Sequence, residues 1–160
     1  MSPNNLSGRK KSVLFFELSK EKFNYLIAEY NFSLVSTRKD GGLYEIVFQN
    51  KTTAVIVNWE RHENWIYIEL YRLVNGMLVT NPIIISDQTE LNGYHLDDLL
   101  SIRCPDFSLT KFPVDDKDIV AILKNYSAML HQYATDVLNG DFTIFGDLEK
   151  IVKGRIASSK

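Results

Sequence analysis

TTAVIVNWERHENWIYIELYRL, residues 52–73, decides the fold of this chain. Residues 52–59 form a run rich in β-branched side chains, and residues 65–73 alternate between apolar and polar or aromatic positions, as strands do. Between them, residues 61–64 interrupt both patterns with four polar side chains. The stretch therefore predicts a β-hairpin whose exposed tip is this polar turn.

The same alternation continues on the N-terminal side, over residues 44–48, and Asn50-Lys51 suits a turn. A one-residue slip would move every side chain to the opposite face, so the apolar positions indicate the register. We expect Trp59 opposite Ile66, Val57 opposite Ile68, Val55 opposite Leu70, Ile46 opposite Val55 and Tyr44 opposite Val57. The result is an antiparallel meander, extended to four or five strands by residues 32–37 and 77–80.

Helical spacing dominates the remaining folded parts of the chain. The predicted helices cover residues 20–31, 94–102, 115–138 and 143–156, while the apolar run 13–18 fits either a strand or an earlier helical turn. The predicted fold class is α+β. An N-terminal helix and two or three C-terminal helices pack on the antiparallel sheet.

Length and composition fit one globular domain, with 160 residues, 45% of them hydrophobic and 24% charged. Residues 1–11 are polar and end in three basic residues, so we expect a flexible tail before a single domain over residues 12–157. The lone cysteine, Cys104, excludes an intrachain disulfide and fits a reducing compartment. Because the chain also has no apolar run of membrane-spanning length and no signal-like segment, we expect a cytoplasmic protein without a membrane partner.

The net charge and the motifs of the sequence argue against several functional classes. The net charge of −2 gives no bulk attraction to nucleic acid. The chain has no phosphate-binding loop, dinucleotide fingerprint, nucleophile elbow or zinc-protease motif. His62 and its two neighbours lie together on the expected turn, and the pair His95 and Asp98 is too small for a metal site. The sequence therefore predicts no catalytic residue, no metal and no cofactor.

In the expected register, one sheet face is apolar and the other combines large aromatic rings with carboxylates. The candidate partner-binding residues on this second face are Glu45, Glu60, Trp65, Tyr67, Glu69 and Tyr71. Tyr and Trp contribute strongly to protein interfaces, and carboxylates steer a basic partner, whereas binders of single strands pair aromatic rings with Arg or Lys. In the competing interpretation, a helix or loop of the same chain covers this face.

The segment from the meander through DDLLSIR, residues 97–103, to YATDVLNGDFTIF, residues 133–145, resembles small bacterial α+β proteins, some of them similar to toxin-immunity proteins. The similarity lies in the layout and in the phrase Leu-x-Gly-Asp-Phe at residues 138–142. It implies a non-enzymatic protein of immunity or antitoxin type that neutralises a basic partner such as a toxin, and it transfers no site residue. The alternatives are a ligand-binding protein or enzyme with a pocket between sheet and helices, a single-stranded nucleic-acid binder, and a homodimer formed through the aromatic face.

Overall fold

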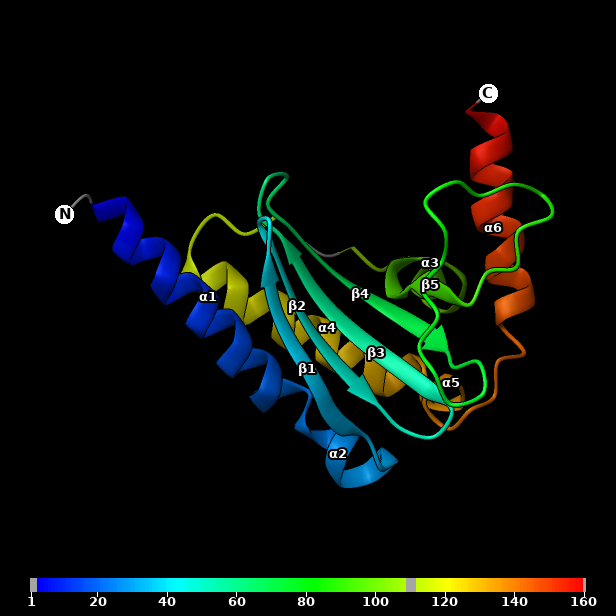
Figure 1. Cartoon of the computed structure of the whole chain (residues 1–160), viewed down its shortest axis with the longest axis horizontal. Helices are drawn as coiled ribbons and strands as arrows, with labels where there is room; N and C mark the ends of the chain where they lie inside the picture. The colour runs from blue at the N-terminus through cyan, green and yellow to red at the C-terminus, as the bar shows by residue number, and fades with distance from the viewer. Residues whose placement is uncertain (1–2, 109–111, 160) are drawn as a thin grey trace.

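The computed structural model describes residues 3–108 and 112–159. Its centre is one five-stranded sheet in which each strand pairs antiparallel with the next along the chain (Figure 1). The strands are β1 (Ser33–Asp40), β2 (Leu43–Gln49), β3 (Thr53–Glu60), β4 (Trp65–Arg72) and β5 (Gly93–His95). The predicted meander and the predicted α+β class are confirmed.

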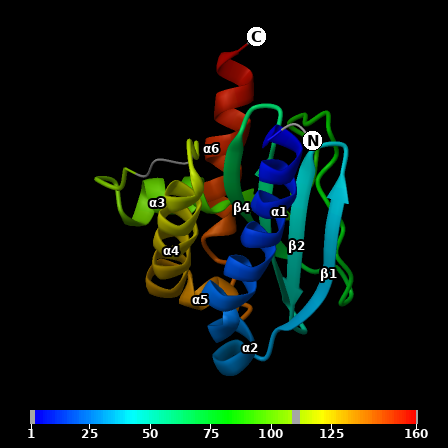
Figure 2. The same ribbon diagram turned by 90° about the vertical axis from the view of Figure 1, so that its left-hand side faces the viewer.

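The helices lie against one face of this sheet and beyond its β5 edge. They are α1 (Pro3–Lys22), α2 (Asn24–Tyr30), α3 (Leu96–Arg103), α4 (Asp116–Tyr133), α5 (Thr135–Leu138) and α6 (Phe145–Ser158). Figure 2 shows α3 and α4 on one side of the sheet and the green segment that follows β4 on the other side. None of the described helices has both the length and the apolarity needed to cross a membrane.

The main core fills the space between the sheet and the helices. Inward side chains of β2, β3 and β4 alternate along each strand and meet apolar residues of α1, α3 and α4. Trp59, only 2% exposed, contacts Phe15 of α1 with ring centroids 5.7 Å apart. Each fully buried large apolar side chain contributes about 1.5–3 kcal/mol, so this face holds the fold together.

The β3–β4 register agrees with every predicted pair, since Trp59, Val57 and Val55 face Ile66, Ile68 and Leu70. The predicted β2–β3 register is wrong by two residues. The observed pairs are Tyr44 with Trp59, Ile46 with Val57 and Phe48 with Val55.

The Asn50 side chain explains this shift, because its Oδ1 accepts hydrogen bonds from the backbone N–H groups of Thr52 (3.0 Å) and Thr53 (2.8 Å). These bonds build a turn longer than the predicted two residues. A shift by two positions keeps every side chain on its predicted face.

Other boundaries also differ from the predictions. The chain is already helical from Pro3, where a flexible tail was expected over residues 1–11, and α1 includes the ambiguous run 13–18. Once the turn around buried Phe15 is fixed by packing, extending a helix by further turns is cheap. Residues 1–2 lie outside the described part of the chain. Residues 77–80 form no strand, and only an isolated bridge joins Val74 to Met77.

Candidate functional site

The sheet face opposite the helices, called the outer face below, carries all six predicted partner-binding residues. Strand pairing places Glu45 beside Asn58, Asn58 beside Tyr67, and Glu60 beside Trp65. Glu69 pairs with His95 of β5. Paired residues of neighbouring strands share one face, so the structure brings these side chains together.

The loop over residues 73–92 covers one part of the outer face. Leu78 of this loop packs on a second apolar cluster, formed by Val47, Ala54, Ile56, Tyr71 and Leu73. Tyr71 is only 4% exposed. For this residue the competing interpretation is correct, because a loop of the same chain covers its ring.

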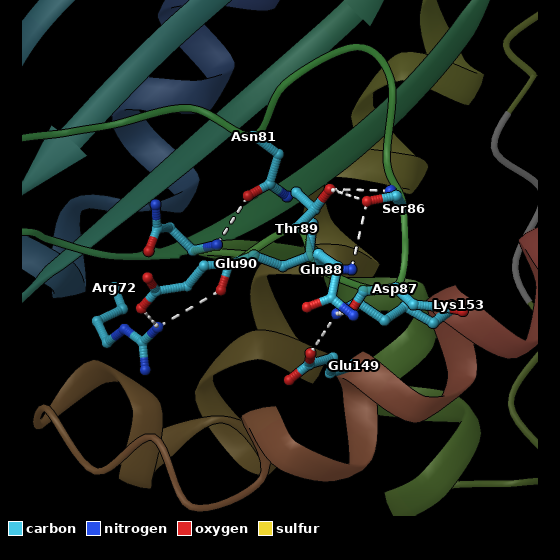
Figure 3. A network of polar contacts seen from close by, with 11 residues as sticks. Arg72, Asn81, Ser86, Asp87, Gln88, Thr89, Glu90, Glu149 and Lys153 are labelled. Atoms are coloured by element: carbon cyan, nitrogen blue, oxygen red, sulfur yellow. Dashed lines mark hydrogen bonds and ion pairs between the residues drawn. The ribbon is translucent and has the colours of Figure 1, made fainter.

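Asn81 fixes this loop on the sheet (Figure 3). Its backbone N–H donates to the Tyr71 hydroxyl at 3.4 Å, and its Nδ2 donates to the carbonyl oxygen of Gly93 at 2.8 Å. Its Oδ1 accepts the backbone N–H of Asn92 at 2.7 Å. Farther along, Lys153 of α6 donates to the carbonyl oxygen of Asp87 at 2.9 Å (Figure 3). Hydrogen bonds therefore anchor the loop at Asn81 and at Asp87.

The part of the outer face beyond the loop carries three clustered rings, Trp65, Tyr67 and His95, called the aromatic platform below. The ring centroids of Trp65 and Tyr67 lie 4.4 Å apart, and those of Tyr67 and His95 lie 5.0 Å apart with planes only 7° from parallel. All three side chains are half-buried. The prediction missed His95 as part of this site because β5 was not foreseen.

Glu69 lies beside the platform in a mostly enclosed position. Burial raises the pKa of its carboxyl group, and the positive charge of His95 opposes that rise. Its Oε1 accepts a hydrogen bond from Asn58 Nδ2 at 2.9 Å, and its Oε2 accepts one from the Tyr71 hydroxyl at 3.3 Å. The carboxylate is therefore held in place by two donors but is poorly hydrated.

Two more carboxylates complete the site. Burial raises the pKa of Tyr67 to about 12, and the negative charges of Glu69, Glu45 and Glu60 add to this rise. Glu60 accepts the backbone N–H groups of Glu63 (2.6 Å) and His62 (3.1 Å), bonds that lower its own pKa. Three acidic groups thus act on one phenol.

This arrangement suits a cation. A Lys or Arg side chain gains from the face of an aromatic ring and from charge-assisted hydrogen bonds to carboxylates. Among the described residues, Arg38 is the cation that pairs with this group, since it lies 3.6 Å from the Glu45 carboxylate, and its side chain is more than half exposed. The outer face therefore has unbalanced negative charge around a ring platform.

An enzyme site of the kind considered above needs two features, a histidine beside a carboxyl group of raised pKa and an enclosing pocket. Glu69 and His95 provide the first feature. The second feature, the pocket, is not provided by the three clefts described next, because neither Glu69 nor His95 lines any of them. Three described clefts lie elsewhere: one of about 440 Å³ between the loop and α6, one of about 280 Å³ lined by Lys11 and Arg61, and one of about 390 Å³ at the start of α4.

The remaining sequence candidates separate in space. His62 and Glu63 lie at the exposed hairpin tip, as predicted, but Arg61 folds back over Trp59 with its Cζ 4.4 Å from the ring centroid. Asp98 pairs with Arg155 at 2.6 Å. In the part of the chain that the structure describes, no three His, Cys, Asp or Glu side chains are grouped to hold a metal ion.

Comparison of the chain with protein-family models, with curated proteins and with solved structures found no match. The resemblance to immunity proteins therefore stays a prediction, and the geometry of the outer face is the basis for the functional proposal.

Proposed function

We propose that this chain is a small, non-enzymatic cytoplasmic protein that binds a basic protein partner through the outer face, in the manner of an immunity protein or antitoxin. One observation supports the proposal above all. Three carboxylates, those of Glu45, Glu60 and Glu69, share one sheet face with Tyr67, and their negative charges add to the rise of its pKa. This is the sheet face that none of the described helices covers.

The energetics favour a cationic side chain over this platform. A cation on an aromatic face contributes about 0.5–2 kcal/mol, and a hydrogen bond to a charged group contributes about 1.5–3 kcal/mol. The buried position of Glu69 strengthens the argument, because its ionised form lacks water and gains from an incoming positive charge. A lysine or arginine of the partner would supply that charge.

The loop that covers Tyr71 adds exposed apolar side chains. Ile83 is 102% exposed and Ile84 is 85% exposed, on a loop held in place by Asn81. Interfaces commonly combine apolar contacts with charged groups, so these two residues extend the surface available to a partner.

The test is affinity capture of the tagged protein from a lysate of its own source cells, with nuclease treatment and mass spectrometry. The wild type is compared with a Trp65→Ala, Tyr67→Ala variant. A control variant, Glu21→Gln with Val13→Ala, changes an exposed acid and an exposed apolar side chain of α1, away from the outer face. We expect one stoichiometric, nuclease-resistant basic protein that is lost only from the first variant.

Recovery of the same protein by the Trp65→Ala, Tyr67→Ala variant would contradict the outer face as the binding surface. Recovery that depends on nucleic acid would favour the single-strand binder instead, and failure to recover any partner would count against the whole proposal.

A second candidate function, a small-ligand-binding protein or enzyme, is favoured by the contact of Glu69 with His95 alone. His95→Gln distinguishes the two. It would remove proton transfer by this pair but would leave the rings of Trp65 and Tyr67 and the carboxylates for a protein partner. Ligand binding lost in His95→Gln with capture intact would support this second candidate.

A further inference from the structure

The hairpin between β3 and β4 places Arg61 on the helix side of the sheet, opposite to the outer face. Its guanidinium lies over two rings, with Cζ 4.4 Å from the Trp59 centroid and 5.7 Å from the Tyr44 centroid. Its backbone N–H donates to the carbonyl oxygen of Gly42 at 2.8 Å. The arginine is therefore held by stacking and by the backbone.

The Nη1 atom of Arg61 is buried and has no hydrogen-bond partner among residues 3–108 and 112–159. A buried donor left without an acceptor costs about 1–3 kcal/mol, and more when it is charged. Such an atom marks a place where an acceptor fits.

Arg61 lines a cleft of about 280 Å³ together with Lys11 of α1, Asn64 of the hairpin and Asp115 at the start of α4. Among the residues that the structure describes, neither Lys11 nor Arg61 forms an ion pair. Two cationic side chains thus border one hollow, and neither forms an ion pair with a described carboxylate.

The other polar groups of this cleft already have partners. Asn64 donates to the carbonyl oxygen of Pro113 and accepts the indole N–H of Trp59 at 3.0 Å. Asp115 accepts the backbone N–H of Asp118 at 3.0 Å, which caps α4. The buried donor without an acceptor therefore belongs to Arg61, Lys11 adds a second positive charge, and the chemical complement of the two is an anion.

We propose that this cleft binds a compact oxyanion, such as the phosphate group of a small molecule, between Arg61 and Lys11. A guanidinium presents two parallel N–H groups that match a phosphate, and stacking on Trp59 fixes their direction before binding. The Asp115 carboxylate lies in the same cleft and opposes the two cations, so free inorganic phosphate binds weakly. The site lies on the helix side and does not depend on the function proposed for the outer face.

The test is titration of the full chain with inorganic phosphate at constant ionic strength, with chloride as the reference anion. Trp59 fluorescence reports binding in a Trp65→Phe background. Arg61→Gln and Lys11→Gln should each weaken phosphate binding about tenfold. Lys20→Gln should leave it unchanged, because Lys20 lies on the same helix but pairs with Glu17 at 3.6 Å.

Phenyl phosphate and acetate distinguish the sources of the anion. Tighter binding of phenyl phosphate than of inorganic phosphate assigns the site to a phosphate ester, equal binding assigns it to the free ion, and a preference for acetate overturns the phosphate assignment. Equal responses to phosphate and chloride would also overturn the proposal, as would unchanged affinity in Lys11→Gln. Lys11→Gln keeps the test valid if Arg61→Gln does not fold.

Discussion

Replacing Gly93 by alanine tests how the outer face is built. A Cβ at this position would lie 2.4–2.5 Å from three ring atoms of Tyr71, closer than Cβ atoms approach other atoms. The Tyr71 ring must therefore move, although it is only 4% exposed and its hydroxyl contacts Glu69 and the backbone of Asn81. Overpacking costs about 1–3 kcal/mol and each lost hydrogen bond about 1 kcal/mol. We expect a loss of about 3 kcal/mol, which lowers Tm by roughly 6–12 °C.

Urea unfolding followed by circular dichroism measures this loss, with Gly146→Ala as the matched control. Nothing lies within 4 Å of a Cβ at Gly146, which sits in α6, so alanine there should stabilise the fold by about 0.5–1 kcal/mol. In a Tyr71→Ala background, Gly93→Ala should become nearly neutral. Wild-type stability of Gly93→Ala, or an equal cost in both backgrounds, would refute the reasoning.

Three further substitutions probe other parts of the structure. Arg103 donates to both carboxylate oxygens of Asp136 at 2.6 Å, and these bonds lower the pKa of Asp136. The resulting stability is present above the unfolded pKa and is lost as pH falls through the folded pKa, so Asp136→Asn should cost on the order of 1 kcal/mol at neutral pH and progressively less in urea unfolding as pH falls below 3.8, the ordinary aspartate pKa. Burial raises the pKa of Glu69, so the proton it retains stabilises the fold below the unfolded pKa, and this contribution is lost as pH rises through the folded pKa. As pH rises above 4.5, the unfolding free energy of Glu69→Gln should therefore increase relative to that of the wild type. Parallel plots of the two unfolding free energies against pH would contradict the burial of this charge. Asn50→Ala removes five hydrogen bonds and should cost about 2 kcal/mol or more, whereas Asn50→Asp keeps the acceptor for the turn and should cost less, as denaturant midpoints would show.

The alternating pattern predicted which side chains share a face, because an error of two residues in register leaves every side chain on its face. The β3–β4 pairs were predicted correctly, since four consecutive polar residues at 61–64 leave one position for the turn. The β2–β3 pairs were not, since the length of that turn depends on hydrogen bonds of the Asn50 side chain that no periodicity reveals. Arg61 was placed at the exposed tip, although its two-residue separation from buried Trp59 already indicated the helix side.

The composition of the outer face was predicted only in part. His95 was missed because β5 has three residues and exists through its pairing with β4, although Gly93 before two aromatic side chains was a usable signal of close packing. The cover over Tyr71 comes from a loop without periodicity, positioned by the side chain of Asn81. Such long-range contacts arise from tertiary structure and leave little trace in local sequence.

The most direct test of the outer face as a binding surface compares two charge reversals in binding to the purified partner. Glu45→Lys and Glu17→Lys change the net charge equally, but Glu45 lies on the outer face beside Arg38, whereas Glu17 lies exposed on α1. Isothermal titration calorimetry should show that Glu45→Lys lowers the affinity for the partner by about tenfold or more, whereas Glu17→Lys leaves it unchanged. Equal affinities of the two variants for the partner would contradict the proposed binding surface.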